Sequence, residues 1–138
     1  MTDLMKAAVG DELPCLSIRI TRQGVVRYSG ASTDFNPIHF SDRQARAIGL
    51  DGVVAHGMWT MGAALRIVTD WAGDPGLVRG YFVRFVSPVQ VPDDDLGVVV
   101  AVTAKVTALS DDLITIGIDA SCAGNKVLGA ARAEVRRA

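Results

Sequence analysis

Hydrophobic side chains recur at every second residue through much of the second half of the chain. Four runs alternate in this way: residues 80–85, 98–109, 113–122 and 126–135. A period of two is the spacing at which a β-strand presents one face, and Ile114, Ile116 and Ile118 make the third run the clearest. Turn-forming residues at 110–112 and 123–125 separate the last three runs. We therefore predict three successive antiparallel strands.

A helical pattern precedes these strands. From Gly57 to Trp71 the chain is almost free of charge, and Met58, Met61 and Leu65 recur at helical spacing. An apolar surface of this extent is typical of a helix that is buried on all sides. We therefore predict that this helix forms the centre of the fold.

Three shorter elements are predicted in the first half of the chain. Residues 15–20 alternate enough to form a strand. Thr21 is suited to cap a short helix that reaches Tyr28, with Gly30 beyond its end. Ser41 heads a second short helix, with the spacing of a capping box.

Residues 34–39 lie between these two short helices and carry two chemically active side chains. Asp34 brings a carboxylate and His39 an imidazole, on either side of the pair Asn36-Pro37. Proline fixes its own φ and restricts the residue before it, so this stretch is not a continuous helix. We predict a rigid loop that carries an acid and a base.

Composition limits the classes of function. The chain has 138 residues, 49% of them hydrophobic, and a formal net charge of −1. These values suit one domain over residues 1–138, and they give no sign of a nucleic-acid or membrane partner. Neither a leader-like N-terminus nor a long apolar run is seen, so we predict a cytoplasmic protein. Cys15 and Cys122 have no ligand spacing around them, so we predict reduced cysteines.

Two motifs give the chain a family resemblance. D-F-N-P-I-H at residues 34–39, followed by A-H-G-M at residues 55–58, resembles the MaoC-type R-specific hydratases and dehydratases, and the resemblance covers nearly the whole chain. It implies an α+β protein with a single hot-dog fold. In that fold an antiparallel sheet wraps around a long central helix, with an inserted active-site loop and short helices.

The chain resembles two groups within this family. The runs G-D-E-L-P, N-P-I-H and A-H-G-M-W-T-M-G are similar to the short catalytic subunits of actinobacterial 3-hydroxyacyl-acyl-carrier-protein dehydratases of type II fatty-acid synthesis. The run V-T-D-W-A-G-D-P-G at residues 68–76 also resembles small MaoC subunits that act on steroid side-chain CoA thioesters.

The resemblance implies reversible syn addition or elimination of water on a thioester of CoA or acyl carrier protein, with no cofactor beyond that carrier. Dehydration needs a base for the α-proton, an acid for the departing hydroxyl and a donor for the enolate oxygen. We assign the base to His39, the acid to Asp34 and the donor to the backbone N–H of Gly57. Nearby, Asn36 is predicted to hold the loop or a bound water, and His56 to cap or steady the helix start.

Other interpretations of these residues stay open. Alone, Asp34 is typical of a turn before Asn-Pro, and His39 of a satisfied histidine at a helix start. Their pairing favours catalysis. A metal site built from Asp34, His39 and His56 is conceivable, but it lacks a ligand pair at short helical spacing, and we predict no metal. A hot-dog thioesterase and a non-catalytic acyl-binding subunit are the alternative functions.

A single sheet of this kind leaves an edge strand unpaired, and an exposed edge is a template for association. We therefore predict that the working unit is a dimer. It is either a homodimer or a heterodimer with a second hot-dog subunit, and the partner would supply space for the acyl chain.

Overall fold

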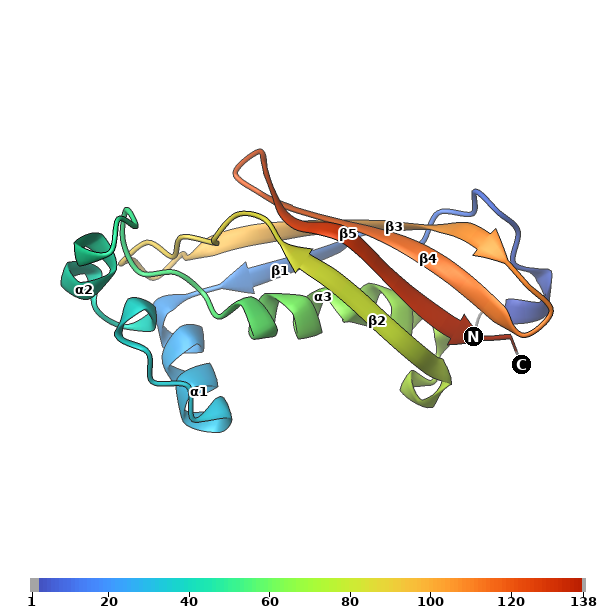
Figure 1. Ribbon diagram of the computed structural model, residues 1–138, viewed down its shortest axis with the longest axis horizontal. Helices are drawn as coiled ribbons and strands as arrows, with labels where there is room; N and C mark the ends of the chain where they lie inside the picture. Colours follow the sequence, from blue (N-terminus) through green and yellow to red (C-terminus); the bar gives the residue numbers. More distant parts are fainter. Residues whose placement is uncertain (1–2, 138) are drawn as a thin grey trace.

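The computed structural model describes residues 3–137. They form a five-stranded antiparallel sheet with one long helix along one face, and the short helices of residues 22–47 are gathered at one end (Figure 1). The elements in chain order are η1 (Leu4–Lys6), β1 (Leu16–Ile20), α1 (Arg22–Ser32), η2 (Pro37–His39), α2 (Asp42–Ala47), α3 (Gly57–Ala72), η3 (Pro75–Leu77), β2 (Val78–Phe85), β3 (Val98–Leu109), β4 (Leu113–Cys122) and β5 (Asn125–Arg136).

The sheet has the strand order β1-β3-β4-β5-β2, and every neighbouring pair is antiparallel. The three predicted successive strands are β3, β4 and β5, and they are neighbours in the sheet as expected. Ile114, Ile116 and Ile118 of β4 are buried, whereas Asp119 and Ser121 are exposed. Burying one such side chain stabilises a fold by about 1.5–3 kcal/mol, so the inner face of the sheet carries much of the stability.

α3 lies against the inner face of the sheet, but only one side of it is buried (Figure 1). Its buried residues are Thr60, Ala64, Ile67, Val68 and Ala72. The prediction of a helix buried on all sides is therefore wrong for this chain. Met58 is 62% exposed, and the position of a Cβ on Gly62 would face open space. The apolar pattern comes from two faces of α3, one packed on the sheet and one left open.

α1 is longer than predicted. Thr21 caps its start, as expected, but the helix continues through Gly30 and ends only before Thr33. A glycine inside a helix costs about 1 kcal/mol, and burial of Val25 and Ser29 on the same helix offsets that cost. Thr33 ends α1 with a φ of +60°, a left-handed conformation that is rare for a β-branched residue.

α2 and the chain before α3 are held as a unit. Ser41 accepts a hydrogen bond from the N–H of Gln44 at the start of α2, which confirms the predicted cap. Further on, residues 53–55 pair with residues 89–91: the N–H of Ala55 donates to the carbonyl of Val89 at 2.8 Å. The chain that leads into α3 is therefore fixed from both sides.

Two further predictions concern the cysteines and the membrane. Cys122 is buried on the inner face of β4, as predicted, and burial raises the pKa of its thiol. Cys15 is exposed, and both cysteines are free. Within residues 3–137, the structure contains no helix that is long and apolar enough to cross a membrane.

Candidate active site

The reactive segment, residues 33–41, lies beyond the N-terminal end of α3 and between α1 and α2 (Figure 1). Asn36 Oδ1 accepts a hydrogen bond from the N–H of Ile38 at 3.2 Å and caps the short helix η2, in which Pro37 is the first residue. Asp34 Oδ1 in turn accepts from the N–H of Asn36 at 3.2 Å. The two bonds hold the segment in one conformation, so Asn36 acts on the loop, the first of its two predicted roles.

His39 is buried, with 7% of its surface exposed. Its Nδ1 lies 2.7 Å from the carbonyl oxygen of Val54, whose own N–H donates to the carbonyl of Ile38 at 3.1 Å. A carbonyl oxygen only accepts hydrogen bonds, so Nδ1 of His39 carries the hydrogen. Nε2 is thereby left as the basic nitrogen of the neutral ring.

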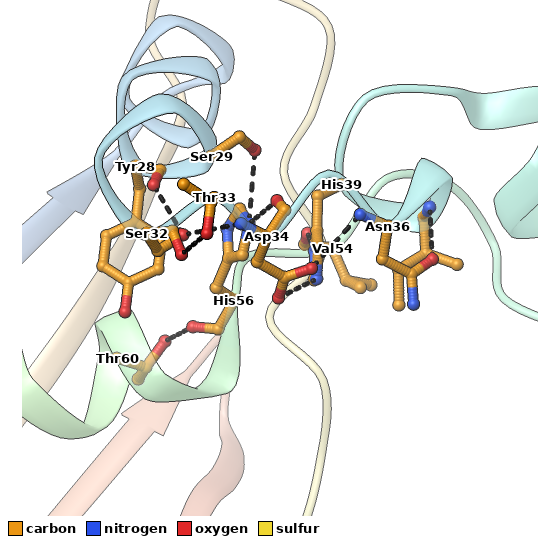
Figure 2. Close-up of polar contacts among 11 residues, drawn as sticks. Tyr28, Ser29, Ser32, Thr33, Asp34, Asn36, His39, Val54, His56 and Thr60 are labelled. Atoms are coloured by element: carbon orange, nitrogen blue, oxygen red, sulfur yellow. Dashed lines mark hydrogen bonds and ion pairs between the residues drawn. The ribbon is translucent and has the colours of Figure 1, made fainter.

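Asp34 and His39 face each other across a short gap (Figure 2). Asp34 Oδ2 lies 3.7 Å from His39 Nε2, and the Asp34 side chain is 51% exposed. This separation is too long for a direct hydrogen bond, but a water or hydroxyl oxygen can lie within about 2.8 Å of both atoms. The structure therefore brings together the acid and base predicted from the sequence.

The sequence did not reveal which group supports Asp34. Thr60 is the nearest hydroxyl along α3, but its Oγ1 donates to the carbonyl of His56 at 3.4 Å. The N–H of Asn36 instead supports one carboxylate oxygen of Asp34. The other oxygen is left facing His39 across the gap.

Gly57 is the first residue of α3, as predicted, and His56 occupies the position before it. His56 makes no side-chain capping bond to this helix, so the first N–H groups of α3 stay available to a carbonyl or anionic oxygen. A Cβ on Gly57 would lie 3.0 Å from Cε1 of Phe85. A side chain at this position would therefore press on the ring of Phe85, which would have to move by a few tenths of an ångström. Sequence reasoning missed Phe85 because nothing marks it as close to Gly57.

His39, Gly57 and Phe85 line one cavity of about 330 Å³. Its other walls are Ile38, Val54, Ala55, Thr60, Val86, Ser87, Pro88, Val89 and Val127. His39 is the one titratable group among the described residues of this lining, and the rest is mainly apolar, which suits an acyl chain with a polar reacting centre. A larger cavity of about 710 Å³ shares part of the wall but is not lined by His39, and Asp34 lines neither cavity. Because His39 lines the smaller cavity, that cavity is the candidate for the acyl group.

His56 is enclosed beside this pair, with 2% of its surface exposed. Its Nε2 lies 3.1 Å from the carbonyl oxygen of Asp34 and 3.2 Å from Oγ of Ser29. Burial lowers the pKa of His56 below its ordinary value. The predicted capping role is not what the side chain does, because it contacts the reactive segment and α1 rather than the N–H groups of α3. No sequence signal pointed to Ser29.

Asp34, His39 and His56 also form the one cluster of metal-ligand type among residues 3–137, with their ligand atoms within 4.8 Å of one another. The two imidazole rings are stacked, with centroids 3.7 Å apart and planes inclined by 21°. An imidazole binds a metal along its ring plane, and nearly parallel planes do not converge on one ion. This geometry suits stacking better than a shared metal.

Sequence reasoning missed a polar clamp behind the reactive segment. Arg22 Nη2 lies 2.8 Å from Asp42 Oδ1, and Arg22 Nε donates to the carbonyl of Val91 at 2.7 Å. Asp42 Oδ1 also accepts from the N–H of Val53 at 2.9 Å. The N–H of Val53 and the guanidinium of Arg22 hold the pKa of Asp42 below its ordinary value. The clamp joins α1 and α2 to the segment before α3 and to the segment after β2 with which it pairs. The sequence spacing of Arg22, Asp42 and Val53 gave no sign of this clamp.

Sequence comparison identifies known proteins that are similar to this chain. Residues 6–115 match the profile of the MaoC like domain. The chain is 40% identical over 79 residues to 3-hydroxyacyl-thioester dehydratase X of Mycobacterium tuberculosis, over 57% of this chain and 27% of that protein. It is 30% identical over 110 residues to the 3-oxo-4,17-pregnadiene-20-carboxyl-CoA hydratase beta subunit of the same organism, over 80% of this chain and 81% of that protein.

Comparison with solved structures identifies proteins whose fold is similar to that of this chain. A MaoC-like dehydratase superposes with a TM-score of 0.94 and 35% identity, over 99% of this chain and 42% of that chain. A chain of the ChsH1-ChsH2 complex from Mycobacterium tuberculosis superposes with a TM-score of 0.79 and 27% identity, over 94% of this chain and 98% of that one. The predicted hot-dog fold is confirmed. The chain spans less than half of the first structure and 27% of the dehydratase relative.

Proposed function

The chain belongs to the MaoC-like dehydratase family, whose domain profile covers residues 6–115, and from that premise we propose that it is a hydro-lyase acting on acyl thioesters. The reaction is the reversible conversion of a (3R)-hydroxyacyl thioester into a 2-enoyl thioester and water. The names of two relatives, a 3-hydroxyacyl-thioester dehydratase and a CoA hydratase subunit, support this reaction class.

One observation carries the proposal: the 3.7 Å gap between Asp34 Oδ2 and His39 Nε2. An oxygen atom in this gap contacts both a carboxyl group and a ring nitrogen whose protonation is set by the carbonyl of Val54. General acid–base catalysis requires groups within hydrogen-bond reach of the transferred protons. Asp34 meets that requirement for an oxygen in the gap, and His39 Nε2 borders the same gap, beside which the hydrogen on C2 of the substrate would lie.

In the direction of dehydration, Nε2 of neutral His39 removes the α-proton from C2. The electron pair of that C–H bond forms the double bond between C2 and C3. Protonated Asp34 gives its proton to the hydroxyl on C3, which leaves as water. Asp34 ends as a carboxylate and His39 as a cation, and a proton returns across the gap. Hydration is the same sequence in reverse.

The N–H of Gly57 is the proposed donor to the thioester oxygen. Removing an α-proton places negative charge on that oxygen, and a helix N-terminus stabilises such charge. Gly57 lines the same cavity as His39. The neighbouring Phe85 ring would be in contact with a Cβ at this position, so a larger residue would disturb both the wall and the donor.

Two substrate classes fit the comparisons. We favour fatty acyl thioesters carried on CoA or on acyl carrier protein, and the carrier is the only cofactor that the proposed chemistry needs. The alternative is a steroid side-chain CoA thioester, because the CoA hydratase beta subunit matches this chain over 80% of its length. The cytoplasmic location stays a prediction from the sequence.

A second hot-dog subunit is the proposed partner. β2 is an edge strand of the sheet, and exposed apolar side chains lie on it and directly after it: Phe82, Phe85 and Val86 are 46–53% exposed. Exposed apolar groups next to an unpaired edge favour association. The similarity to a chain of the ChsH1-ChsH2 complex supports a heterodimer. Sedimentation of the isolated chain across a dilution series tests the homodimer, and sedimentation after mixing with a candidate second subunit tests the heterodimer. A stable monomer in both measurements would contradict the proposal.

The reaction is tested by incubating the purified protein, alone and with candidate partner subunits, with crotonyl-CoA and longer enoyl thioesters. We expect the absorbance of the conjugated thioester to fall as water adds. Release of free thiol, measured in parallel, would instead indicate a thioesterase. Binding of the thioesters without either change would indicate a non-catalytic subunit.

A further inference from the structure

His56 contacts both halves of the proposed catalytic pair. Its ring stacks on the ring of His39, with centroids 3.7 Å apart, and Tyr28 of α1 packs against it at 4.7 Å (Figure 2). Its Nε2 lies within hydrogen-bond distance of the backbone carbonyl of Asp34, and also of Oγ of Ser29. His56 is not among the residues that line the cavity proposed for the substrate. It therefore contacts the catalytic pair from outside that cavity.

The contacts determine which ring nitrogen carries the hydrogen. The carbonyl of Asp34 only accepts, so Nε2 of His56 must donate. Nδ1 of His56 is buried and finds no hydrogen-bond partner among the residues that the structure describes. A hydrogen on Nδ1 would therefore be buried without an acceptor, and the lone pair of Nε2 would face a carbonyl oxygen. Both are unfavourable, and the Nε2–H form avoids both.

The two histidines consequently have opposite tautomers. His39 carries its hydrogen on Nδ1, where it donates to the carbonyl of Val54, and keeps Nε2 free for the α-proton. His56 carries its hydrogen on Nε2, where it donates to the carbonyl of Asp34. The ring of His39 can thus act as a base through Nε2, while the ring of His56 donates a hydrogen bond through Nε2.

We propose that His56 is a positioning residue for the pair Asp34–His39. Its Nε2–H fixes the backbone of Asp34, and its neutral ring fixes the plane of His39, so that the gap between their side chains keeps its width. The catalytic part of this proposal rests on the hydratase function proposed above. The tautomer part rests only on the hydrogen bonds.

Neutrality of His56 matters because of what His39 does. When His39 takes the α-proton it becomes a cation, and a second cation stacked on it would oppose that step. The titratable groups that face His56 are Tyr28 from α1 and Asp34 and His39 from the reactive segment. Burial is the largest effect on His56 and lowers its pKa, and the positive charge of His39 acts in the same direction. The hydrogen bond to the Asp34 carbonyl and the Asp34 charge raise the pKa, but the net shift is downward and favours the neutral form of His56 beside His39.

Nitrogen NMR of the ¹⁵N-histidine-labelled protein tests the tautomers without any substrate. The chain contains only two histidines, so His56→Phe assigns both sets of signals. With both rings neutral we expect one Nδ1–H ring and one Nε2–H ring, with the Nδ1–H ring surviving in His56→Phe. An Nδ1–H form of His56, or rapid exchange between its two forms, would overturn the proposal.

Two variants then separate positioning from simple packing. His56→Phe keeps an aromatic ring but loses the donor, and His56→Gln keeps an N–H donor with similar reach but loses the ring. With crotonyl-CoA we expect His56→Phe to lower kcat about 10–100-fold at nearly unchanged KM, as for other residues that orient a reacting group, and His56→Gln to recover part of that loss. Equal kcat in wild type and both variants, with only the melting temperature lowered, would overturn the positioning role. If wild type itself hydrates no thioester but shows the two tautomers, the proposed function fails while the hydrogen-bond arrangement stands.

Discussion

The sheet with α3 and the reactive segment are held in place by different forces. In the sheet, side chains such as Val102, Ile116 and Ala133 are fully buried, and the strands are fixed by apolar burial. In residues 33–41, His39 is the one buried residue. The reactive segment takes its geometry from hydrogen bonds to Asn36, to the carbonyl of Val54 and to His56.

Because of this difference, we expect substitutions in the two regions to change stability and activity to different extents. An exposed side chain on the reactive segment, such as that of Asp34, contributes little buried area, so its loss costs little folding free energy. The same side chain takes part in proton transfer, so its loss affects the rate strongly. We expect the opposite for the sheet and for the clamp behind the segment.

The largest effect is expected for the catalytic pair. Asp34→Asn and His39→Gln should each lower kcat about a hundred-fold or more, because each removes one proton-transfer group. The free energy of unfolding, measured with urea, should change by less than about 1 kcal/mol for Asp34→Asn, because the Asp34 side chain is 51% exposed. It should fall by about 1–3 kcal/mol for His39→Gln, because buried His39 bonds the carbonyl of Val54. Asp70→Asn is the matched control, since Asp70 is exposed on α3 and pairs only with Arg66 at 3.5 Å among the described residues. Wild-type rates in either catalytic variant would reject the assigned site.

The clamp should show the reverse behaviour. Asp42→Asn leaves Arg22 without its partner and weakens the bond to the N–H of Val53, so we expect a loss of about 2 kcal/mol in the free energy of unfolding. Because folding lowers the pKa of Asp42 from 3.8, its stabilising effect is complete above that pH and is lost as the pH falls through the lower folded value. The stability difference between wild type and variant should therefore be full at neutral pH and shrink in acid. A difference that does not depend on pH would contradict this.

Gly57 lies where the two regions meet. Gly57→Val should lower kcat about ten-fold, which is about 1.4 kcal/mol, because the new side chain meets Phe85 and displaces the N–H donor. Adding Phe85→Ala removes the clash, and we expect stability to recover but not kcat. Full recovery of kcat in the double variant would show that Gly57 only makes room for the ring.

The smallest effects are expected where a residue other than glycine has a positive φ. Ala130, on an exposed part of β5, has a φ of +48°, and Thr33, next to Asp34, has a φ of +60°. Ala130→Gly should stabilise the protein by about 0.5–1 kcal/mol and leave kcat unchanged. Thr33→Gly should also relieve strain, but it loosens the backbone of Asp34 and should lower kcat by less than about ten-fold. Identical kinetics in both variants would mean that Thr33 does not orient Asp34.

The strands were predictable because their signal is local. β3 and β4 have the bounds that the alternation predicted, and β5 differs by one residue at each end. The same reasoning failed for α3, because an apolar face packed on a sheet and an apolar face left open, like that of Met58, look alike in sequence. It failed for α1 because Gly30 resembles a helix end, whereas the tertiary contacts of Val25 carry the helix past it.

The catalytic pair was found because Asp34 and His39 are close in sequence, around a proline that fixes the loop. The stacking of His39 on His56 and the pairing of Arg22 with Asp42 join residues 17 and 20 positions apart. Such contacts depend on how the helices pack, and no spacing rule predicts them. For this reason the sequence predicts that His56 caps or steadies the helix start, and it gives no sign of the contact with His39.

The most direct test of the proposed mechanism is the stereochemistry of hydration in D₂O. Asp34 and His39 flank one gap, so the oxygen added at C3 and the deuteron added at C2 should reach the same face of the double bond. Crotonyl-CoA should give a single product, (3R)-3-hydroxybutyryl-CoA with deuterium at C2 in the syn position, as read by NMR. An anti product, or a mixture of the two, would show that Asp34 and His39 do not act on the same face of the double bond.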